Sequence, residues 1–402
     1  LNPKTWEVFD DPVCDLSVQS DKLRIEDFYP EMKGQVAFSG QIRGPATRPH
    51  GRLEFTGHSL DLAEQTVAGV KGMVRFEGED LFIDRLAADI RNGETVEAAG
   101  RVSLINETYD MTLKSRGVSL KHIDAFAGQD VVSGTISADL EGQGRFDDPA
   151  FRGKVRATKV VLNGEPFDDA DLDVLMDRKT IFLSGKALAG VEARVHIETY
   201  DFSASATFEE LVLDPFLRMA EATGLQGKMS GEVHAVGNLE NLDGIKAEAL
   251  VTDLLMKNGD VTLVTNKRLE ASYEDKRFLI QDSRFALLDK GDILVGGRGT
   301  KDGALDLYLK GTSPLSVADL FSEDLSGIVG DVIVDGRMGG TFDKPDILAT
   351  MTIRDASFMI PELMQSIHEV NGEVRMDSKS VTIERLRGKL DSGTFRINGS
   401  LA

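Results

Sequence analysis

The sequence predicts an all-β protein built from repeats of about 100 residues, with short helices between the repeats. Three observations carry this prediction. A glycine-led motif returns at a near-constant spacing, apolar and polar residues alternate along the chain, and turn-forming residues separate the alternating segments. The first is typical of repeat arrays, and the other two are typical of strands joined by tight turns.

The glycine-led motif occurs four times, beginning at Gly34, Gly134, Gly231 and Gly330, so that it recurs after 100, 97 and 99 residues. Such a period indicates one repeat array rather than unrelated domains. We expect one continuous body with copies over 34–133, 134–230 and 231–329 and a truncated copy over 330–402. Residues 1–33 resemble the tail of a preceding copy, so we expect the chain to be a piece of a longer protein.

Alternating segments such as 52–56, 72–77, 81–84 and 305–309 predict strands with one polar face and one apolar face. Turn signals separate the strands at 77–80, 92–93, 163–164, 258–259 and 371–372. One short helix is expected in each copy, most clearly over 214–224, and residues 119–127 and 316–321 occupy the same slot. Asp214 could cap that helix, Pro215 suits its first turn, and Gly224 suits its end.

The residues two and four positions after each leading glycine are apolar in all four copies, which predicts one apolar face along the stack. The same alternation adds two residues each from 52–56 and 305–309. The predicted lining is Val36, Phe38, Ile136, Ala138, Val233, Ala235, Val332, Val334, Leu53, Phe55, Leu305 and Leu307. This face could be the closed core of a β-sandwich, which alternation alone favours, or an open groove for acyl chains.

Composition excludes several classes of protein. The 46 basic and 67 acidic residues leave a net charge of −21, which argues against a nucleic-acid partner. The single cysteine, Cys14, cannot form an internal disulfide, and no apolar run approaches the roughly 18 residues that a membrane-spanning helix needs.

The sequence predicts no enzyme, no cofactor and no metal site. The six histidines are scattered without metal-ligand spacing, and no nucleophile motif or phosphate-binding loop occurs. Residues 168–173 resemble the start of a calcium loop but lack its glycine and its final glutamate, so a solvated strand face is the favoured interpretation. A polysaccharide-cleaving β-helix is the rival from another class, but it would need clustered carboxylates, whereas the acidic residues here are spread over every copy.

The repeated unit, which is a glycine-led strand, a glycine-containing bend, a proline and a further strand, resembles the TamB and AsmA-like family. Residues 325–345 are the most typical stretch and 132–153 the next. The third copy departs from the pattern because it lacks the proline. The resemblance covers essentially the whole chain and implies an elongated sheet curled into a taco-like open groove.

The resemblance also implies a location and a role. Members lie in the periplasm, tethered to the inner membrane by a segment that this chain does not contain. The implied function is a non-enzymatic bridge that carries phospholipid acyl chains along an apolar groove between the inner and outer membranes. The alternative is a scaffold for outer-membrane protein assembly that pairs a strand edge with a barrel partner of the TamA or BamA type.

Overall fold

The computed structural model describes residues 13–27, 32–62, 65–124, 132–220, 222, 224–288, 290–301, 303–319, 326–341, 344–360, 365–391 and 393–401. The chain divides into two compact units, Leu1–Thr199 and Tyr200–Ala402. The boundary between them falls inside the copy expected over 134–230. Whether the copies form one continuous body therefore stays a prediction, and each unit is described by itself.

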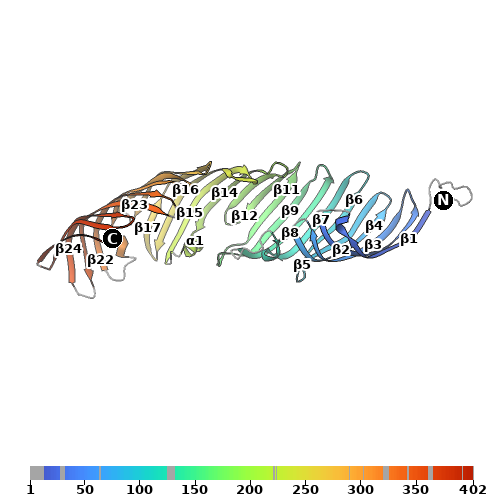
Figure 1. Cartoon of the computed structure of the whole chain (residues 1–402), viewed down its shortest axis with the longest axis horizontal. Helices are drawn as coiled ribbons and strands as arrows, with labels where there is room; N and C mark the ends of the chain where they lie inside the picture. Colours follow the sequence, from blue (N-terminus) through green and yellow to red (C-terminus); the bar gives the residue numbers. More distant parts are fainter. Residues whose placement is uncertain are drawn as a thin grey trace, which may run out of the picture. The chain divides into compact units, whose positions relative to one another are not determined.

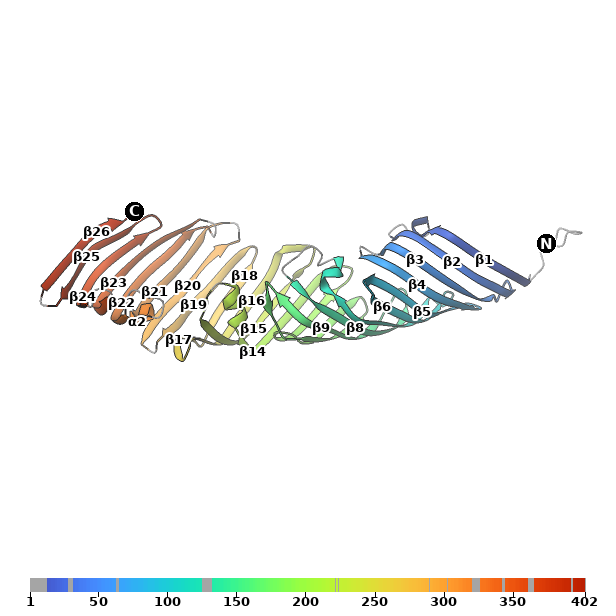
Figure 2. The same cartoon turned by 90° about the horizontal axis from the view of Figure 1, so that it is seen from below.

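Unit 1 is a sheet with short 3₁₀ turns at its border (Figures 1 and 2). Its elements are β1 (Val13–Arg24), η1 (Ile25–Asp27), β2 (Met32–Pro45), β3 (His50–Leu62), β4 (Gln65–Glu77), β5 (Asp80–Arg91), β6 (Glu94–Ser103), β7 (Thr108–Ser119), η2 (Leu120–His122), β8 (Val132–Arg145), β9 (Phe151–Leu162), β10 (Glu165–Pro166), β11 (Ala170–Asp177), β12 (Thr180–Lys186) and β13 (Gly190–His196).

Unit 2 has the same construction. Its elements are β14 (Asp201–Val212), α1 (Asp214–Met219), β15 (Leu225–Asn238), β16 (Asn241–Asn258), β17 (Val261–Asn266), β18 (Leu269–Glu274), β19 (Arg277–Leu287), β20 (Gly291–Thr300), β21 (Leu305–Pro314), α2 (Ser316–Asp319), β22 (Ser326–Gly340), β23 (Pro345–Ile360), β24 (Gln365–Asp377), β25 (Val381–Leu390) and β26 (Gly393–Leu401).

Within each unit the strands form an elongated, curled antiparallel meander, so the prediction of an all-β groove fold with short helices is confirmed (Figure 2). Consecutive strands pair, with two local variations. Strand β9 pairs with both β10 and β11. Strand β16 pairs with β17 near its end and with β18 farther back, and β17 also pairs with β19. A meander needs only short turns, which agrees with the closely spaced turn signals in the sequence.

The leading glycine of every copy lies at a β-bulge between its own strand and the next one. The register shifts are at Lys33/Gln35, Ser133/Thr135, Ser230/Gly231 and Val329/Asp331. At Gly330 the backbone has a φ of +111°, and a Cβ there would lie 2.7 Å from the Cα of Ala356. A bulge bends its strand and increases the local twist, so the repeated glycines help to curl the sheet.

The short helices contact the leading strand of the following copy, with η1 on β2, η2 on β8, α1 on β15 and α2 on β22. The detailed prediction for α1 is wrong in two respects. Leu213 is its N-cap residue and Ala220 its C-cap, so Asp214 and Gly224 do not play those parts. Asp214 instead accepts a hydrogen bond from the Gly227 N–H at 3.0 Å, which ties the helix to β15. Parts of the expected helical stretches 119–127 and 316–321 lie outside the described residues.

The buried core of unit 1 lies on the face that contains Val36. Its members are Val36, Leu60, Val67, Val70, Ile90 and Val118. Ile25 of η1 and Ile123, which follows η2, pack against this cluster from one border of the sheet. The core therefore occupies one border of the sheet rather than an interior between two stacked sheets.

Candidate functional site

One face of the unit 1 sheet is apolar from strand to strand. Residues directly opposite each other on antiparallel strands share a face, so the pairings define rows of side chains. One such row consists of Phe38, Phe55, Gly72, Leu86, Ala98, Leu113, Leu140, Gly153, Val174, Leu183 and Ala193. It crosses the sheet from β2 to β13 without a polar side chain.

A second row lies beside the first on the same face, because its members are two residues away along each strand. It consists of Val36, Gly57, Val70, Ala88, Val96, Ser115, Ala138, Val155, Leu172, Gly185 and Val191. The hydroxyl of Ser115 is its one polar group. We call the face that carries these two rows the apolar face of unit 1.

Unit 2 has a matching face, defined by two rows in the same way. The first row is Ala206, Val233, Ala249, Ala271, Ile280, Gly297, Leu307, Met338 and Ile347. The second row is Phe285, Ile293, Gly311, Val334, Met351, Val374, Ile383 and Gly399. We call the face that carries these two rows the apolar face of unit 2.

The twelve residues predicted from the sequence divide equally between the two faces. On the face of unit 1, Val36 is buried, while the half-buried members are Phe38, Leu53, Phe55, Ile136 and Ala138. On the face of unit 2, Leu305 is buried and Val233 is 36% exposed, while the half-buried members are Ala235, Leu307, Val332 and Val334. Strand pairing thus brings each set of six onto one face of its unit.

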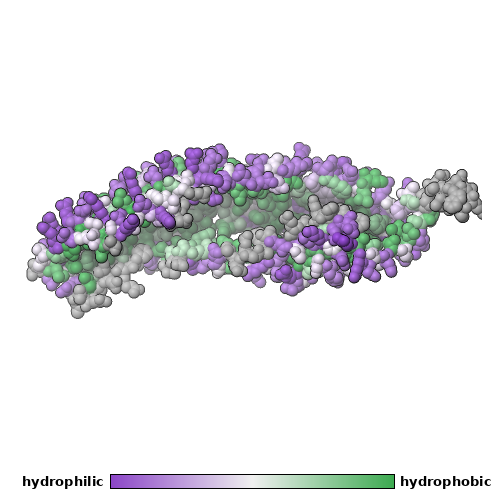
Figure 3. All heavy atoms as spheres, in the orientation of Figure 1, coloured by the Kyte–Doolittle hydropathy of each residue, from purple (hydrophilic) through white to green (hydrophobic). Residues whose placement is uncertain are grey.

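Parts of both apolar faces are open to solvent. Leu113 in unit 1 is 38% exposed and Leu309 in unit 2 is 40% exposed, although both belong to an apolar face. Unit 2 also has a hollow of about 340 Å³ on this face, lined by Val264, Phe285, Leu287, Ile293, Val295, Leu309, Ser313 and Val334. Within each unit, Figure 3 shows apolar residues in the hollowed middle and hydrophilic residues along the borders of the hollow. The apolar faces are therefore partly open surfaces rather than sealed cores.

The opposite face of unit 1 is charged. One row of this outer face alternates in sign across five strands, as Glu97, Lys114, Asp139, Lys154 and Asp173. The Lys114 Nζ lies 3.2 Å from an Asp139 carboxylate oxygen, and the Lys154 Nζ lies 3.6 Å from one of Asp173. Exposed pairs of this kind contribute little stability, so their main effect is to keep this face in water.

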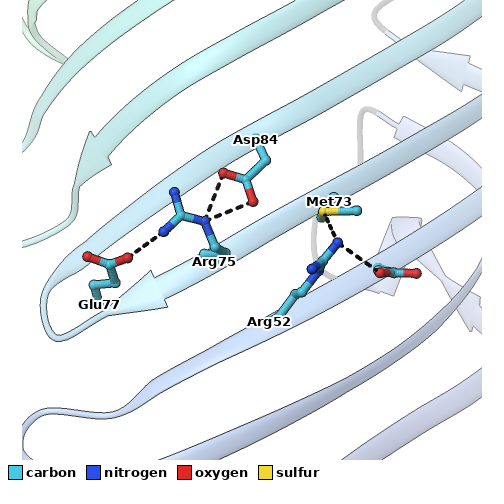
Figure 4. A network of polar contacts seen from close by, with 6 residues as sticks. Arg52, Met73, Arg75, Glu77 and Asp84 are labelled. Carbon is cyan, nitrogen blue, oxygen red and sulfur yellow. Dashed lines mark hydrogen bonds and ion pairs between the residues drawn. The ribbon is translucent and has the colours of Figure 1, made fainter.

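A second group of polar contacts on the outer face joins β3, β4 and β5 (Figure 4). The Arg75 Nε donates to both carboxylate oxygens of Asp84 at 2.8 Å, and its Nη1 lies 2.5 Å from Glu77. These carboxylates, with Asp84 first, raise the pKa of Arg75. Every group in this network has an internal partner, and none is placed as a free nucleophile or base.

Residues 119–124 cover one border of the apolar face of unit 1. The Glu94 carboxylate at the start of β6 accepts the Ser119 N–H at 3.0 Å and lies 2.9 Å from the His122 Nδ1. Farther back, Asp124 accepts the Thr66 N–H at 2.7 Å. Burial opposes ionisation of Glu94, but its hydrogen bonds to His122 and Ser119 outweigh burial and lower its pKa. The segment therefore crosses from β7 back to β6 and β4.

The aspartates at 168–173 lie in and beside β11, and two of them pair with cations of the protein itself. Asp171 pairs with Arg156, which lowers the pKa of Asp171, and Asp173 pairs with Lys154. Asp169 accepts the Lys159 N–H at 3.2 Å. Among the residues placed by the structure, no cluster of His, Cys, Asp or Glu could hold a metal ion.

Sequence reasoning missed much of the apolar lining, including Leu86, Leu113, Leu140, Val174 and Leu183. Their alternation is visible in the sequence, most clearly over 171–177 and 180–186. What the sequence lacks is the register between strands, and register decides which of the two alternating sets joins the row that contains Phe38.

Within the part of the chain that the structure describes, there is no helix of the length and apolarity needed to cross a bilayer. No curated protein and no solved structure matches the chain. Residues 84–357 match the family of the TamB C-terminal domain, and the matched region includes strands of both apolar faces. The glycine-led repeats, the curled antiparallel sheet and this match agree: the chain belongs to the TamB family.

Proposed function

We propose that this chain carries phospholipid acyl chains along its apolar faces as a non-enzymatic segment of a lipid bridge between the inner and outer membranes. The family suggests a role in transport of lipid or protein in the cell envelope. One observation favours lipid: a partly open, uncharged face continues from strand to strand, while the reverse face is charged. An acyl chain needs such a lining, and a soluble substrate does not.

The energetics support a passive role. Exposing an acyl chain to water costs roughly 0.8 kcal/mol for each CH₂ group. A continuous apolar face removes most of this penalty at every point along the path, so an acyl chain can move along it without a large free-energy barrier. No charged side chain interrupts the rows that cross unit 1 from β2 to β13, and a buried charge would create such a barrier.

We also propose where in the cell this path lies. The path would lie in the periplasm, and a segment outside this chain would tether it to the inner membrane. Headgroups would stay in water above the groove while the tails lie in it. No catalytic residue is assigned, because lipid movement along such a face needs no bond to be formed or broken.

Adjacent alanines in β6 provide a matched test. Ala98 lies on the apolar face opposite Leu86 and Leu113, whereas Ala99 lies on the outer face opposite Thr112. Lipid that co-purifies with the protein is extracted and quantified by mass spectrometry. We expect phospholipid with the parent chain and with Ala99→Asp, and much less with Ala98→Asp. Equal lipid with both variants, or none with the parent chain, would overturn the proposal.

A scaffold for outer-membrane protein assembly is the second candidate, because the family suggests a role in the transport of lipid or protein in the cell envelope. An exposed sheet edge can bind another strand through backbone hydrogen bonds. A crosslink from a strand edge of this chain to a barrel protein, with no lipid on the apolar faces, would favour this function over lipid transport.

A further inference from the structure

Six glycines on the apolar faces lie directly opposite a phenylalanine of the neighbouring strand. The pairs are Phe55–Gly72, Phe151–Gly142, Phe202–Gly237, Phe208–Gly231, Phe278–Gly299 and Phe395–Gly388. Each phenylalanine lies an even number of residues from an apolar-face residue of its own strand, so its side chain is on the same face. The arrangement recurs in both units, so it is a general feature of these faces rather than a local accident.

In four of these pairs, those of Gly72, Gly142, Gly299 and Gly388, the phenyl ring occupies the space that a side chain at the glycine would need. At Gly231 and Gly237 other atoms, from the neighbouring strand β16, lie closer than the ring does. A Cβ at Gly72 would lie 2.1, 2.4 and 2.7 Å from three ring atoms of Phe55. A Cβ at Gly142 would lie 2.3 Å from the Cδ1 of Phe151, and one at Gly299 or Gly388 would lie 2.6 Å from the opposite ring. The ring therefore lies down over the adjacent strand, whereas strand side chains ordinarily stand away from the sheet.

We propose that these four phenylalanine–glycine pairs keep the groove clear, because each glycine lets the opposite ring lie flat on the sheet instead of projecting into the acyl path. This inference rests on the proposed function and adds the residues that set the free depth of the groove. Phenylalanine supplies a large apolar surface for contact with acyl chains. The opposite glycine makes that surface part of the floor.

A substitution at Gly72 tests this role without a direct clash with the backbone. The three atoms nearest to a Cβ at this position all belong to the Phe55 ring, and Gly72 does not adopt a left-handed φ. At Gly153, by contrast, a Cβ would lie 2.1 Å from the backbone oxygen of Asp139. A side chain at position 72 therefore displaces the Phe55 ring, whereas a side chain at position 153 would collide with the backbone of the neighbouring strand.

The test is binding of a fluorescent acyl-labelled phosphatidylethanolamine, presented in vesicles of phosphatidylethanolamine and phosphatidylglycerol, to the whole chain. Gly72→Val should weaken binding about tenfold, which corresponds to lost contact with roughly two methylene groups. Gly69→Val is the matched control in the same strand. Gly69 lies on the outer face opposite His58, and its nearest obstacle is 3.4 Å away, so this variant should bind as the parent does.

The double variant Phe55→Ala/Gly72→Val removes the displaced ring and should restore binding to within about twofold of the parent chain. Weak binding by the double variant, or parental binding by Gly72→Val, would overturn this inference while leaving the proposed function intact. Absence of binding by the parent chain would instead overturn the proposed function. If Gly72→Val does not fold, Gly142→Val with Phe151→Ala decides in the same way, since Phe151 is 36% exposed and its ring can move.

Discussion

The His122 imidazole Nδ1 lies 2.9 Å from the Glu94 carboxylate, which joins the turn after β7 to the beginning of β6. An ionised carboxylate can only accept, so Nδ1 carries the proton and donates it. Leu120 is buried and Ile123 packs against the core of unit 1. The Glu94–His122 pair therefore holds residues 119–124 over one border of the apolar face.

This contact predicts a response to acid. Because folding lowers the pKa of Glu94, its ionised form stabilises the covered border. The contribution is complete above the ordinary glutamate pKa of about 4.3 and is lost as the pH falls through the lower folded-state value. Hydrogen exchange at the Ser119 amide should therefore accelerate in this acidic range.

Glu94→Gln should show the faster exchange already at neutral pH, with a loss of about 1–2 kcal/mol in the free energy that protects this segment. Exchange at Thr66 reports on the neighbouring Asp124 contact and should change less. If the Ser119 amide exchanges at the same rate in the parent chain and in Glu94→Gln, the Glu94–His122 pair does not hold residues 119–124 in place.

Val332 and Ile333 are neighbours in β22 on opposite faces, and they distinguish an open groove from a sealed core. Val332 lies opposite Ser313 and Ile353, whereas Ile333 lies opposite Thr312 and Thr352. In an open groove, Val332→Asp should remove bound lipid with a modest change in melting temperature, because water reaches the carboxylate. Ile333→Asp should keep the lipid. A sealed core would instead lose several kcal/mol with Val332→Asp, visible as a collapse of its melting temperature.

The leading glycines should be among the least replaceable residues. Gly330→Ala forces an alanine into a left-handed backbone and against Ala356, so we expect a loss of about 2–4 kcal/mol in the free energy of unfolding. The control in the same strand is Gly336→Ala, where a Cβ would lie 3.7 Å from its nearest neighbours. Denaturant unfolding compares the two variants, and similar losses for both would contradict the role assigned to the bulge.

The fold was largely predictable because its determinants are local. Alternation specifies the two faces of each strand, and the repeated glycines fall at the bulges of β2, β8, β15 and β22. The predicted turns at 92–93 and 163–164 lie between strands as expected. The predicted turn at Asn371–Gly372 is wrong, because both residues lie inside β24.

The errors arise from contacts between distant parts of the sequence. Asn371 suggests a turn, but its side chain accepts the Asp355 N–H at 3.0 Å. It therefore provides a hydrogen-bond partner for the backbone at a bulge of the neighbouring strand. The Glu94–His122 contact and the phenylalanine–glycine pairs likewise depend on register. No single-strand pattern contains that information, since a shift of one residue would exchange the two faces.

The central claim is that acyl chains lie on the apolar faces, and site-specific photo-crosslinking in cells tests it most directly. A photoreactive residue replaces Leu113, which is 38% exposed on the apolar face, or the adjacent Thr112, which points to the outer face beside Ala99. Mass spectrometry then measures phospholipid adducts on the purified protein. We expect adducts at position 113 and few or none at position 112. Equal adducts at the two positions, or none at position 113, would contradict it.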